Sequence, residues 1–153
     1  VLPVVEAVPG IIPYDQTVLF LSEEQTVASL RADSILEHLQ LHSASYRRWL
    51  GRPSCGGLFF VNREVYLKCG GENEHFYGWG PEDAERVRRM EILGYPVGVN
   101  TEGPLYHLWH PRGDNSRFFN RQLASNSRLE LIRICNMDTK ELTDDVASWR
   151  NRK

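Results

Sequence analysis

The chain has 153 residues, a formal net charge of −2, and 41% apolar and 25% charged residues. These values are typical of a globular protein, and the length fits one domain, so residues 1–153 are expected to form a single domain. The slightly negative charge argues against a nucleic-acid-binding protein, and no apolar run approaches the length of a membrane span.

The N-terminal part is expected to contain short strands followed by one long helix. Residues 1–20 are apolar and β-branched but are interrupted by proline and glycine, which predicts short edge strands and turns. Ser22-Glu23-Glu24-Gln25 has the form of a capping box and predicts a helix start. Apolar residues at helical spacing continue from there toward Trp49, and Gly51-Arg52-Pro53 ends the helix.

The middle of the chain is expected to contain a buried strand and a short helix. Residues 58–61 form a continuous apolar run after Gly56-Gly57, which predicts a buried strand entered through a tight backbone turn. Asn62 is a typical helix N-cap, and Gly70-Gly71 closes the helix that Asn62 begins. Residues 72–79 predict a loop.

The C-terminal part is expected to combine three helices with two strands. Gly80-Pro81-Glu82-Asp83 predicts a helix with proline at its first position, and Gly94 ends that helix. We expect strands at 95–99 and 105–109, a polar loop at 111–115, and helices at 117–135 and 139–149, capped by Ser116 and by Asp138 or Thr139. Without regular βαβ alternation, this order favours a mixed α/β fold with a small mixed sheet flanked by helices.

Two residue types outside the motifs give simple expectations. The three cysteines are widely spaced, which excludes a disulfide framework and favours buried thiols; they are Cys55, Cys69 and Cys135.

Arginines cluster at positions 86, 88 and 89 and again at 112, 117 and 121. Solvated helix faces are the favoured interpretation for most of them, and a site for phosphate or an acidic sugar is the alternative.

The first motif with candidate functional residues surrounds Trp79. Glycines on both sides let the backbone turn sharply, so that the indole can stand in a cleft and bind the apolar face of a sugar. Glu82 and Asp83 fall in the first turn of the following helix, where the helix dipole favours ionised carboxylates, and Glu85 shares a face with Glu82. Such carboxylates bind hydroxyls or act as a general base. An ordinary helix N-terminus is the alternative interpretation.

The second motif is Tyr106-His107-Leu108-Trp109-His110. Residues three apart on a strand point to opposite faces, so His107 and His110 bind one metal ion together only if the strand ends between them. Pro111 makes such an ending plausible, and a structural or surface pair is the alternative. Gly57 permits close approach of a ligand or marks a bulge. Arg112 begins a polar segment that is either a lid over a charged donor or a plain surface loop.

In their order and spacing, these segments resemble the galactosyltransferase and N-acetylgalactosaminyltransferase group over about residues 56–118. The group includes animal β-1,4-galactosyltransferases, polypeptide N-acetylgalactosaminyltransferases and bacterial enzymes of the chondroitin-polymerase type. The matching positions are Gly56-Gly57 with the apolar run after them, Gly70-Gly71 with Glu74, the run from Gly78 to Glu85, Gly94-Tyr95, His107 and His110.

This resemblance implies a GT-A fold and a metal-dependent hexosyltransferase. A UDP-sugar would be the donor and a saccharide or glycoconjugate the acceptor, with Mn²⁺ held by a DxD motif and a later histidine. Asp83 would be the catalytic base and Glu82 would bind hydroxyls. His110 would be the metal ligand, and His107 would lie at the position of a second one. The implied substrate-binding residues are Trp79, Gly57, Gly80, Tyr77, Glu85 and Arg112.

The chain also departs from the family pattern. Pro81 replaces a glycine, Ala84 replaces an acid of the animal enzymes, and Glu85 restores the pattern of the bacterial branch. No DxD precedes Gly56, so we expect the chain to begin just after that motif and to be the acceptor- and metal-binding C-terminal half of the enzyme, inactive or weak by itself.

Three further expectations follow from the resemblance. The Glu82-Asp83 pair favours inversion, although retaining relatives share much of the glycine framework. The bacterial branch implies a cytoplasmic enzyme of surface polysaccharide synthesis, with the Golgi lumen as the alternative. The competing functions are a non-catalytic carbohydrate-binding or scaffolding module and an unrelated small metal-binding domain.

Overall fold

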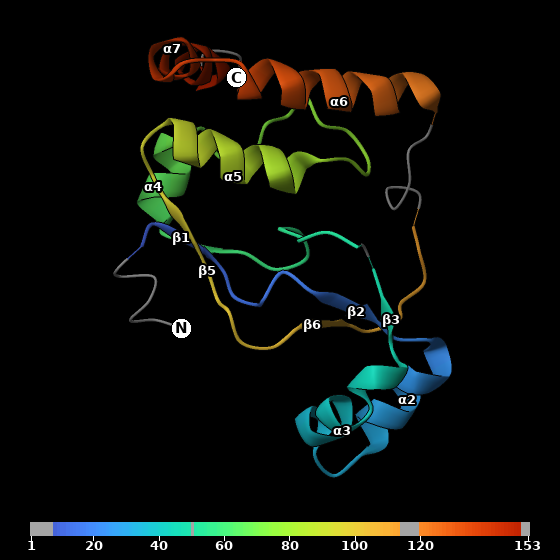
Figure 1. Ribbon diagram of the computed structural model, residues 1–153. Coiled ribbons are helices and arrows are strands. Elements are labelled where there is room, and N and C mark those ends of the chain that lie inside the picture. The colour runs from blue at the N-terminus through green and yellow to red at the C-terminus, as the bar shows by residue number, and fades with distance from the viewer. Residues whose placement is uncertain (1–7, 50, 114–119, 151–153) are drawn as a thin grey trace. The chain divides into compact units, whose positions relative to one another are not determined.

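The computed structural model describes residues 8–49, 51–113 and 120–150. In that part of the chain the fold is mixed α/β, as predicted, with two three-stranded sheets and helices beside them (Figure 1). The sequence predicts one domain, and the structure distinguishes two compact units within the chain. Unit 1 comprises residues 1–11, 59–98 and 112–153, and unit 2 comprises residues 12–58 and 99–111.

The sheet of unit 1 has the strand order β4-β1-β5. Its central strand is β1 (Gly10–Ile12), which pairs antiparallel with β4 (Phe60–Val61), and β5 (Val97–Val99) lies on the other side. The prediction of an edge strand in this region is therefore wrong. Pro9 and Pro13 flank β1 rather than interrupt it, so the strand keeps its own N–H groups for pairing.

The apolar run at residues 58–61 also differs from its prediction. Only Phe60–Val61 is a strand, and it lies at the edge of its sheet. The side chains are not buried, since Leu58 is 42% exposed and Phe60 is 39% exposed. An apolar run does not reveal whether neighbouring elements cover it. The tight turn before the run is confirmed, because Gly57 has a φ of 95°.

The short helix α4 (Arg63–Lys68) has both of its predicted ends. The side-chain oxygen of Asn62 accepts hydrogen bonds from two N–H groups of the first turn, at 3.0 and 3.1 Å. Gly70 and Gly71 follow the helix with φ values of 95° and 71°, in the left-handed region that glycine adopts most readily. Local sequence signals therefore specify this helix.

Three longer helices complete unit 1. Helix α5 (Glu82–Ile92) begins one residue later than predicted, with Pro81 as its N-cap, and Gly94 follows its last turn with a φ of 84°. Helix α6 (Arg121–Cys135) runs alongside α5, and α7 (Thr139–Arg150) follows it (Figure 1). Within the described segments, no helix has the length and apolar character needed to cross a membrane.

The N-caps of α6 and α7 can be compared with the cap residues predicted from the sequence. The Asn120 side chain caps α6 by accepting a hydrogen bond from the Leu123 N–H at 2.9 Å. Ser116, the predicted cap, lies outside the described residues. Asp138 accepts a hydrogen bond from the Glu141 N–H at 2.8 Å, which confirms Asp138 as the cap of α7.

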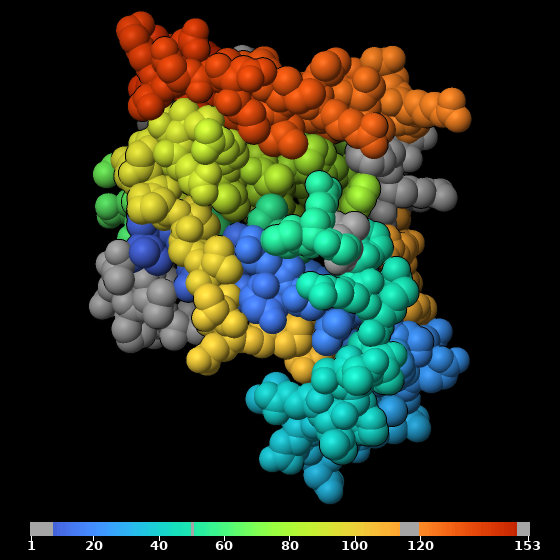
Figure 2. Space-filling model, in the orientation of Figure 1, coloured from blue at the N-terminus to red at the C-terminus, as the bar shows by residue number. Residues whose placement is uncertain are grey.

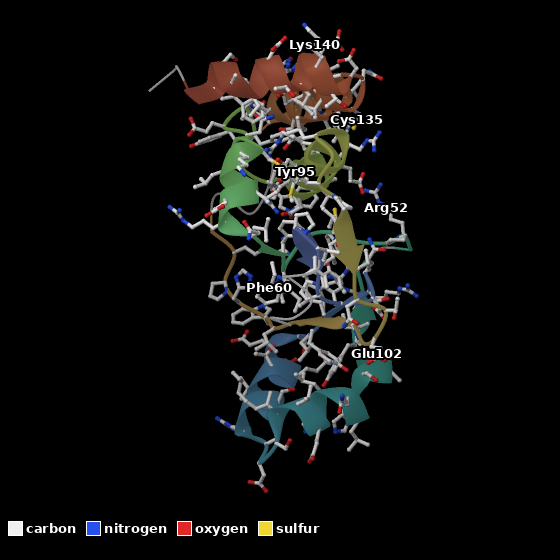
Figure 3. The ribbon with its side chains drawn as sticks, turned by 90° about the vertical axis from the view of Figure 1, so that its left-hand side faces the viewer. Arg52, Phe60, Tyr95, Glu102, Cys135 and Lys140 are labelled. Atoms are coloured by element: carbon white, nitrogen blue, oxygen red, sulfur yellow. The ribbon has the colours of Figure 1, made fainter. Side chains whose placement is uncertain are left out.

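The core of unit 1 lies where α5, α6 and α7 meet, and Figure 2 shows α6 and α7 covering one side of α5. Its members are Ile134, Leu142 and Val146, with Ile92, Leu93, Met137 and Trp149 packed against them. Cys135 and Lys140 lie on the outer surface of α6 and α7 (Figure 3). The prediction of buried cysteines is confirmed for Cys69 alone, since Cys55 is half-buried and Cys135 is exposed.

Unit 2 contains a mixed sheet with the strand order β3-β2-β6. The central strand β2 (Val18–Phe20) pairs antiparallel with β3 (Arg47–Arg48) and parallel with β6 (Leu105–His107). The predicted edge position of this region is wrong here as well. The core under the sheet consists of Leu21, Leu39 and Tyr46, with Leu19, Tyr106 and Leu108 packed against them.

The single helix predicted for residues 22–49 is in fact two helices. Ser22 forms the predicted capping box at the start of α2 (Glu23–Arg31). The backbone is extended at Ala32, and Ser34 caps a second helix, α3 (Ile35–Leu41), by accepting a hydrogen bond from an N–H of its first turn. The predicted helix is too long because apolar residues keep their helical spacing across the break between α2 and α3.

The Gly70→Ala variant is expected to destabilise the protein by about 2–4 kcal/mol. A methyl group there would lie 2.9 Å from both Val146 and Trp149 of α7, and the left-handed backbone adds strain. Gly94→Ala is the matched control, because Gly94 also has a positive φ but has open space around its Cα. Urea unfolding of both variants measures the difference, and equal losses would show that contact with α7 contributes nothing.

Candidate functional site

Apart from Arg112, the predicted site residues of unit 1 lie in α5 and in the loop before it. Tyr77 and Trp79 belong to the loop before the helix and are 64% and 45% exposed. Gly78 turns this loop with a φ of 76°. A Cβ atom at Gly80 would lie only 3.4 Å from the Oε2 atom of Glu82. Two exposed aromatic side chains and a carboxyl group therefore lie within one short, glycine-containing segment.

Glu82 differs from an ordinary surface carboxylate. Its Oε2 atom is buried and has no hydrogen-bond partner among the described residues. Burial raises the pKa of Glu82, the nearby charge of Asp83 raises it further, and backbone N–H groups of Glu82 and Gly80 act in the opposite direction. Buried polar atoms nearly always have a partner in native proteins, so this oxygen is suited to receive one from a ligand.

Asp83 lies beside Glu82 and is held in a hydrogen-bond network that extends beyond its own helix. Its Oδ1 atom accepts a hydrogen bond from Arg86 at 2.9 Å. Arg86 also binds Glu72, which in turn accepts a hydrogen bond from the Tyr66 hydroxyl at 2.8 Å. The three-residue spacing of Asp83 and Arg86 on a helix was a usable signal. The contact to Glu72 joins residues 14 positions apart, and no local pattern predicts it.

Glu85, a predicted substrate-binding residue, is buried and paired with Arg89, and a role in substrate binding stays a prediction. Its side chain is 1% exposed, and both of its oxygens accept hydrogen bonds from Arg89, at 2.7 and 3.2 Å. Arg89 is fully buried and also donates to the carbonyl groups of Cys69 and Gly71. The interpretation of the arginine cluster as a solvated face is therefore wrong for Arg89 and for Arg86, which is 13% exposed, and holds for Arg88, which is half exposed.

The N-terminal end of the loop that carries Trp79 is attached to α6. The Asn73 side chain donates to Glu130 at 2.8 Å, and the His75 ring lies 3.3 Å from the same carboxylate. Hydrogen bonds from Arg133 lower the pKa of Glu130 to about 2, with a further contribution from Asn73. Glu130 is therefore ionised at neutral pH and holds this end of the loop.

In unit 2, the two predicted histidines have rings close together. Strand β6 ends at His107, and the ring centroids of His107 and His110 are 5.3 Å apart. The strand ending that the histidine pair requires is therefore present. Phe20 of the neighbouring strand stacks on the His107 ring, with centroids 4.3 Å apart and an interplanar angle of 11°. This stacking partner depends on strand pairing, which the sequence analysis did not predict.

In both histidines, Nδ1 lies close to a backbone carbonyl group. Nδ1 of His107 lies 3.0 Å from the Leu108 carbonyl, and Nδ1 of His110 lies 3.0 Å from the Pro111 carbonyl. A carbonyl oxygen only accepts, so these contacts favour the tautomer in which Nδ1 carries the proton and Nε2 carries the lone pair. No group of three or more histidines, cysteines or acidic residues that could hold a metal ion occurs in the described ranges.

The two remaining predicted site residues are Gly57 and Arg112. A Cβ atom at Gly57 would lie 2.7 Å from the Leu105 side chain, so packing within unit 2 already requires a glycine there. Approach of a substrate to Gly57 stays a prediction. Arg112 is exposed, and most of the polar loop that it was predicted to begin lies outside the described residues.

Part of the chain matches a protein-family model. Residues 37–111 match the model described as the N-terminal domain of galactosyltransferase, which covers 75 of the 153 residues. This segment contains Trp79, Asp83, His107 and His110. No solved structure matches the chain.

Curated relatives agree with the family model. The chain is similar to beta-1,4-galactosyltransferase 7 of mouse and of human, with 34% identity over 61 residues for each, which is 37% of this chain and 19% of each relative. It is also similar to the Drosophila melanogaster protein of the same name, with 28% identity over 82 residues, or 48% of this chain and 26% of the relative. The chain thus spans about a fifth to a quarter of these relatives. Together the matches support a galactosyltransferase domain in this chain, and the family model matches residues 37–111.

Proposed function

We propose that the chain is part of a glycosyltransferase that moves galactose or a galactose-like sugar from a UDP-sugar to a saccharide or glycoconjugate acceptor. The observation that carries the proposal is the carboxyl pair at the start of α5. Glu82 has a buried oxygen without a partner among the described residues, and Asp83, next to it, is 34% exposed. Trp79 and Tyr77 are exposed in the preceding loop and suit the apolar face of a sugar.

The two carboxyl groups divide the chemistry of an inverting transfer. Glu82 binds an acceptor hydroxyl, and Asp83 accepts the proton of the hydroxyl that reacts. The oxygen of that hydroxyl forms a bond to the anomeric carbon of the donor sugar. The bond from this carbon to the diphosphate breaks, and UDP leaves with the electron pair. Removal of the proton by Asp83 makes the attacking oxygen a better nucleophile.

His107 and His110 fit two positions in the ligand set of a Mn²⁺ ion. Each ring holds its Nδ1–H on a carbonyl group and keeps Nε2 available, the arrangement typical of metal-binding histidines. The carboxylate ligands that Mn²⁺ favours would come from elsewhere in the protein. A bound metal ion would neutralise negative charge on the departing diphosphate.

Calorimetry tests this proposal. UDP is titrated into the 153-residue chain and into the full-length protein, each with and without Mn²⁺. Binding that requires the metal supports a UDP-sugar transferase. If UDP binds under no condition but saccharides bind, a non-catalytic carbohydrate-binding module becomes the better function. The exposed aromatic residues of the 72–79 loop favour that second candidate.

The His110→Ala variant is expected to weaken Mn²⁺ binding by more than about 100-fold in the full-length protein, because a ligand itself is lost and even loss of an outer-shell partner costs about 10–100-fold. Mn²⁺ affinity is measured by calorimetry without any substrate, so the result does not depend on turnover. His42→Ala is the control, since His42 is an exposed histidine that contacts His38 of α3. Unchanged Mn²⁺ affinity in the His110 variant would reject its assignment as a ligand.

A further inference from the structure

Arg86 of α5 lies between two carboxylates of unit 1. Its Nε and Nη2 atoms donate to the two oxygens of Glu72, at 2.7 and 3.1 Å, so this contact is bidentate. Its Nη1 atom donates to Oδ1 of Asp83 at 2.9 Å. Bidentate contacts with a carboxylate fix the plane of a guanidinium group. The direction in which Nη1 meets Asp83 is therefore set by Glu72.

The surroundings of Arg86 strengthen this arrangement. Its side chain is 13% exposed, much less than that of Asp83, and its guanidinium lies 5.7 Å from the centroid of the Phe59 ring. Burial acts against the charged form, but hydrogen bonds and charges of Glu72 and Asp83 hold the pKa of Arg86 above its ordinary value. The Tyr66 hydroxyl holds Glu72 from another side.

We propose that Arg86 is a positioning residue for Asp83, orienting its carboxylate so that Oδ2 remains for the acceptor hydroxyl. The inference rests on the proposed function, in which Asp83 takes the proton. Arg86 itself touches no reacting atom. It limits rotation of the carboxylate, and Glu72 and Tyr66 limit the movement of Arg86.

This role differs from a purely structural one in its kinetic effect. Loss of Arg86 also removes its two hydrogen bonds to Glu72, so a lower unfolding midpoint is expected whether or not Arg86 positions Asp83. A displaced catalytic group, by contrast, lowers the rate of the chemical step strongly. The loss would appear in kcat rather than in KM for the donor, because the interaction matters only when the proton moves.

The kinetic test compares Arg86→Gln, Arg86→Lys and Glu72→Gln in the full-length protein, with Arg88→Gln as the control on the exposed side of the same helix. Arg86→Gln is expected to lower kcat about 10–100-fold with KM for the UDP-sugar changed less than about twofold. Glu72→Gln should lower kcat by a smaller factor, and Arg86→Lys should recover part of the activity. A folded Arg86→Gln protein with kcat within about twofold of the wild type would overturn the proposal.

A second measurement does not depend on glycosyl transfer. Carbodiimide labelling of carboxyl groups, located by mass spectrometry, reports how accessible Asp83 is. Arg86 covers Oδ1, so labelling of Asp83 should be several-fold faster in Arg86→Gln and unchanged in Arg88→Gln. If labelling rises as expected but the wild type transfers no sugar, the contact is supported and the proposed function fails. If the wild type transfers sugar and Arg86→Gln changes neither readout, the positioning role is overturned while the function stands.

Discussion

The Asp83→Asn variant is expected to lose about 10²–10⁴-fold in kcat while its affinity for UDP stays nearly unchanged. Asparagine has almost the same shape and can still accept a hydrogen bond from Arg86, but it cannot take up a proton at neutral pH. The acceptor hydroxyl would then have to react without a general base. Because the change affects only the step in which the proton moves, donor binding should be preserved.

Steady-state kinetics of the full-length protein, together with UDP titration, measure this result. Glu91→Gln is the matched control, since Glu91 is an exposed carboxylate of α5 that pairs with Arg88. The control should keep the kcat of the wild type. If Asp83→Asn retains turnover, Asp83 is not the base, and Glu82, whose pKa is raised by burial, becomes the next residue to replace.

The Arg89→Met variant is expected to destabilise the protein by about 3–5 kcal/mol, the largest stability effect we predict. Arg89 and Glu85 are an almost completely buried ion pair, with 2.7 Å between Nε and Oε1. Removal of the arginine alone leaves a buried carboxylate without a positive partner. It also takes a hydrogen-bond donor from the carbonyl groups of Cys69 and Gly71, which Arg89 binds in the native fold.

Urea unfolding distinguishes this loss from a simple loss of packing. The double variant Glu85→Met, Arg89→Met removes both charges and should be clearly more stable than Arg89→Met, because no charge remains buried. Arg88→Met, at an exposed position one residue earlier, should change the unfolding free energy by less than about 0.5 kcal/mol. A loss below about 1 kcal/mol for Arg89→Met would show that the pair contributes little to stability.

The features that the sequence predicts well are those encoded by neighbouring residues. Ser22, Asn62 and Gly94 mark helix ends because a cap needs only a side chain and the next few N–H groups, or a glycine with a positive φ. The clustering of Trp79 and Asp83 follows in the same way from a turn and the first turn of a helix. These parts of the candidate site need no knowledge of the remaining chain.

The features that the sequence does not predict depend on partners far along the chain. Glu85 looks like one more acid at a helix start, and only the fold shows that its partner Arg89 is buried and donates to carbonyl groups 18 and 20 positions away along the chain. The position of a strand within its sheet likewise depends on which segments pair with it. Phe20 meets His107 because β2 and β6 are parallel neighbours, although 87 positions separate the two residues.

The interleaving of the two units has a practical consequence for dissecting the protein. Unit 1 is made of three separate stretches of chain and unit 2 of two, so no single cut releases either unit intact. An expressed piece that ends near residue 58 would contain most of unit 2 but lack β6, the parallel partner of its central strand. Folding also has to bring β6 to β2 from a distant part of the chain before the sheet of unit 2 is complete, and such non-local pairing is slower than the formation of local contacts. Loss-of-function studies should therefore use point substitutions rather than truncations.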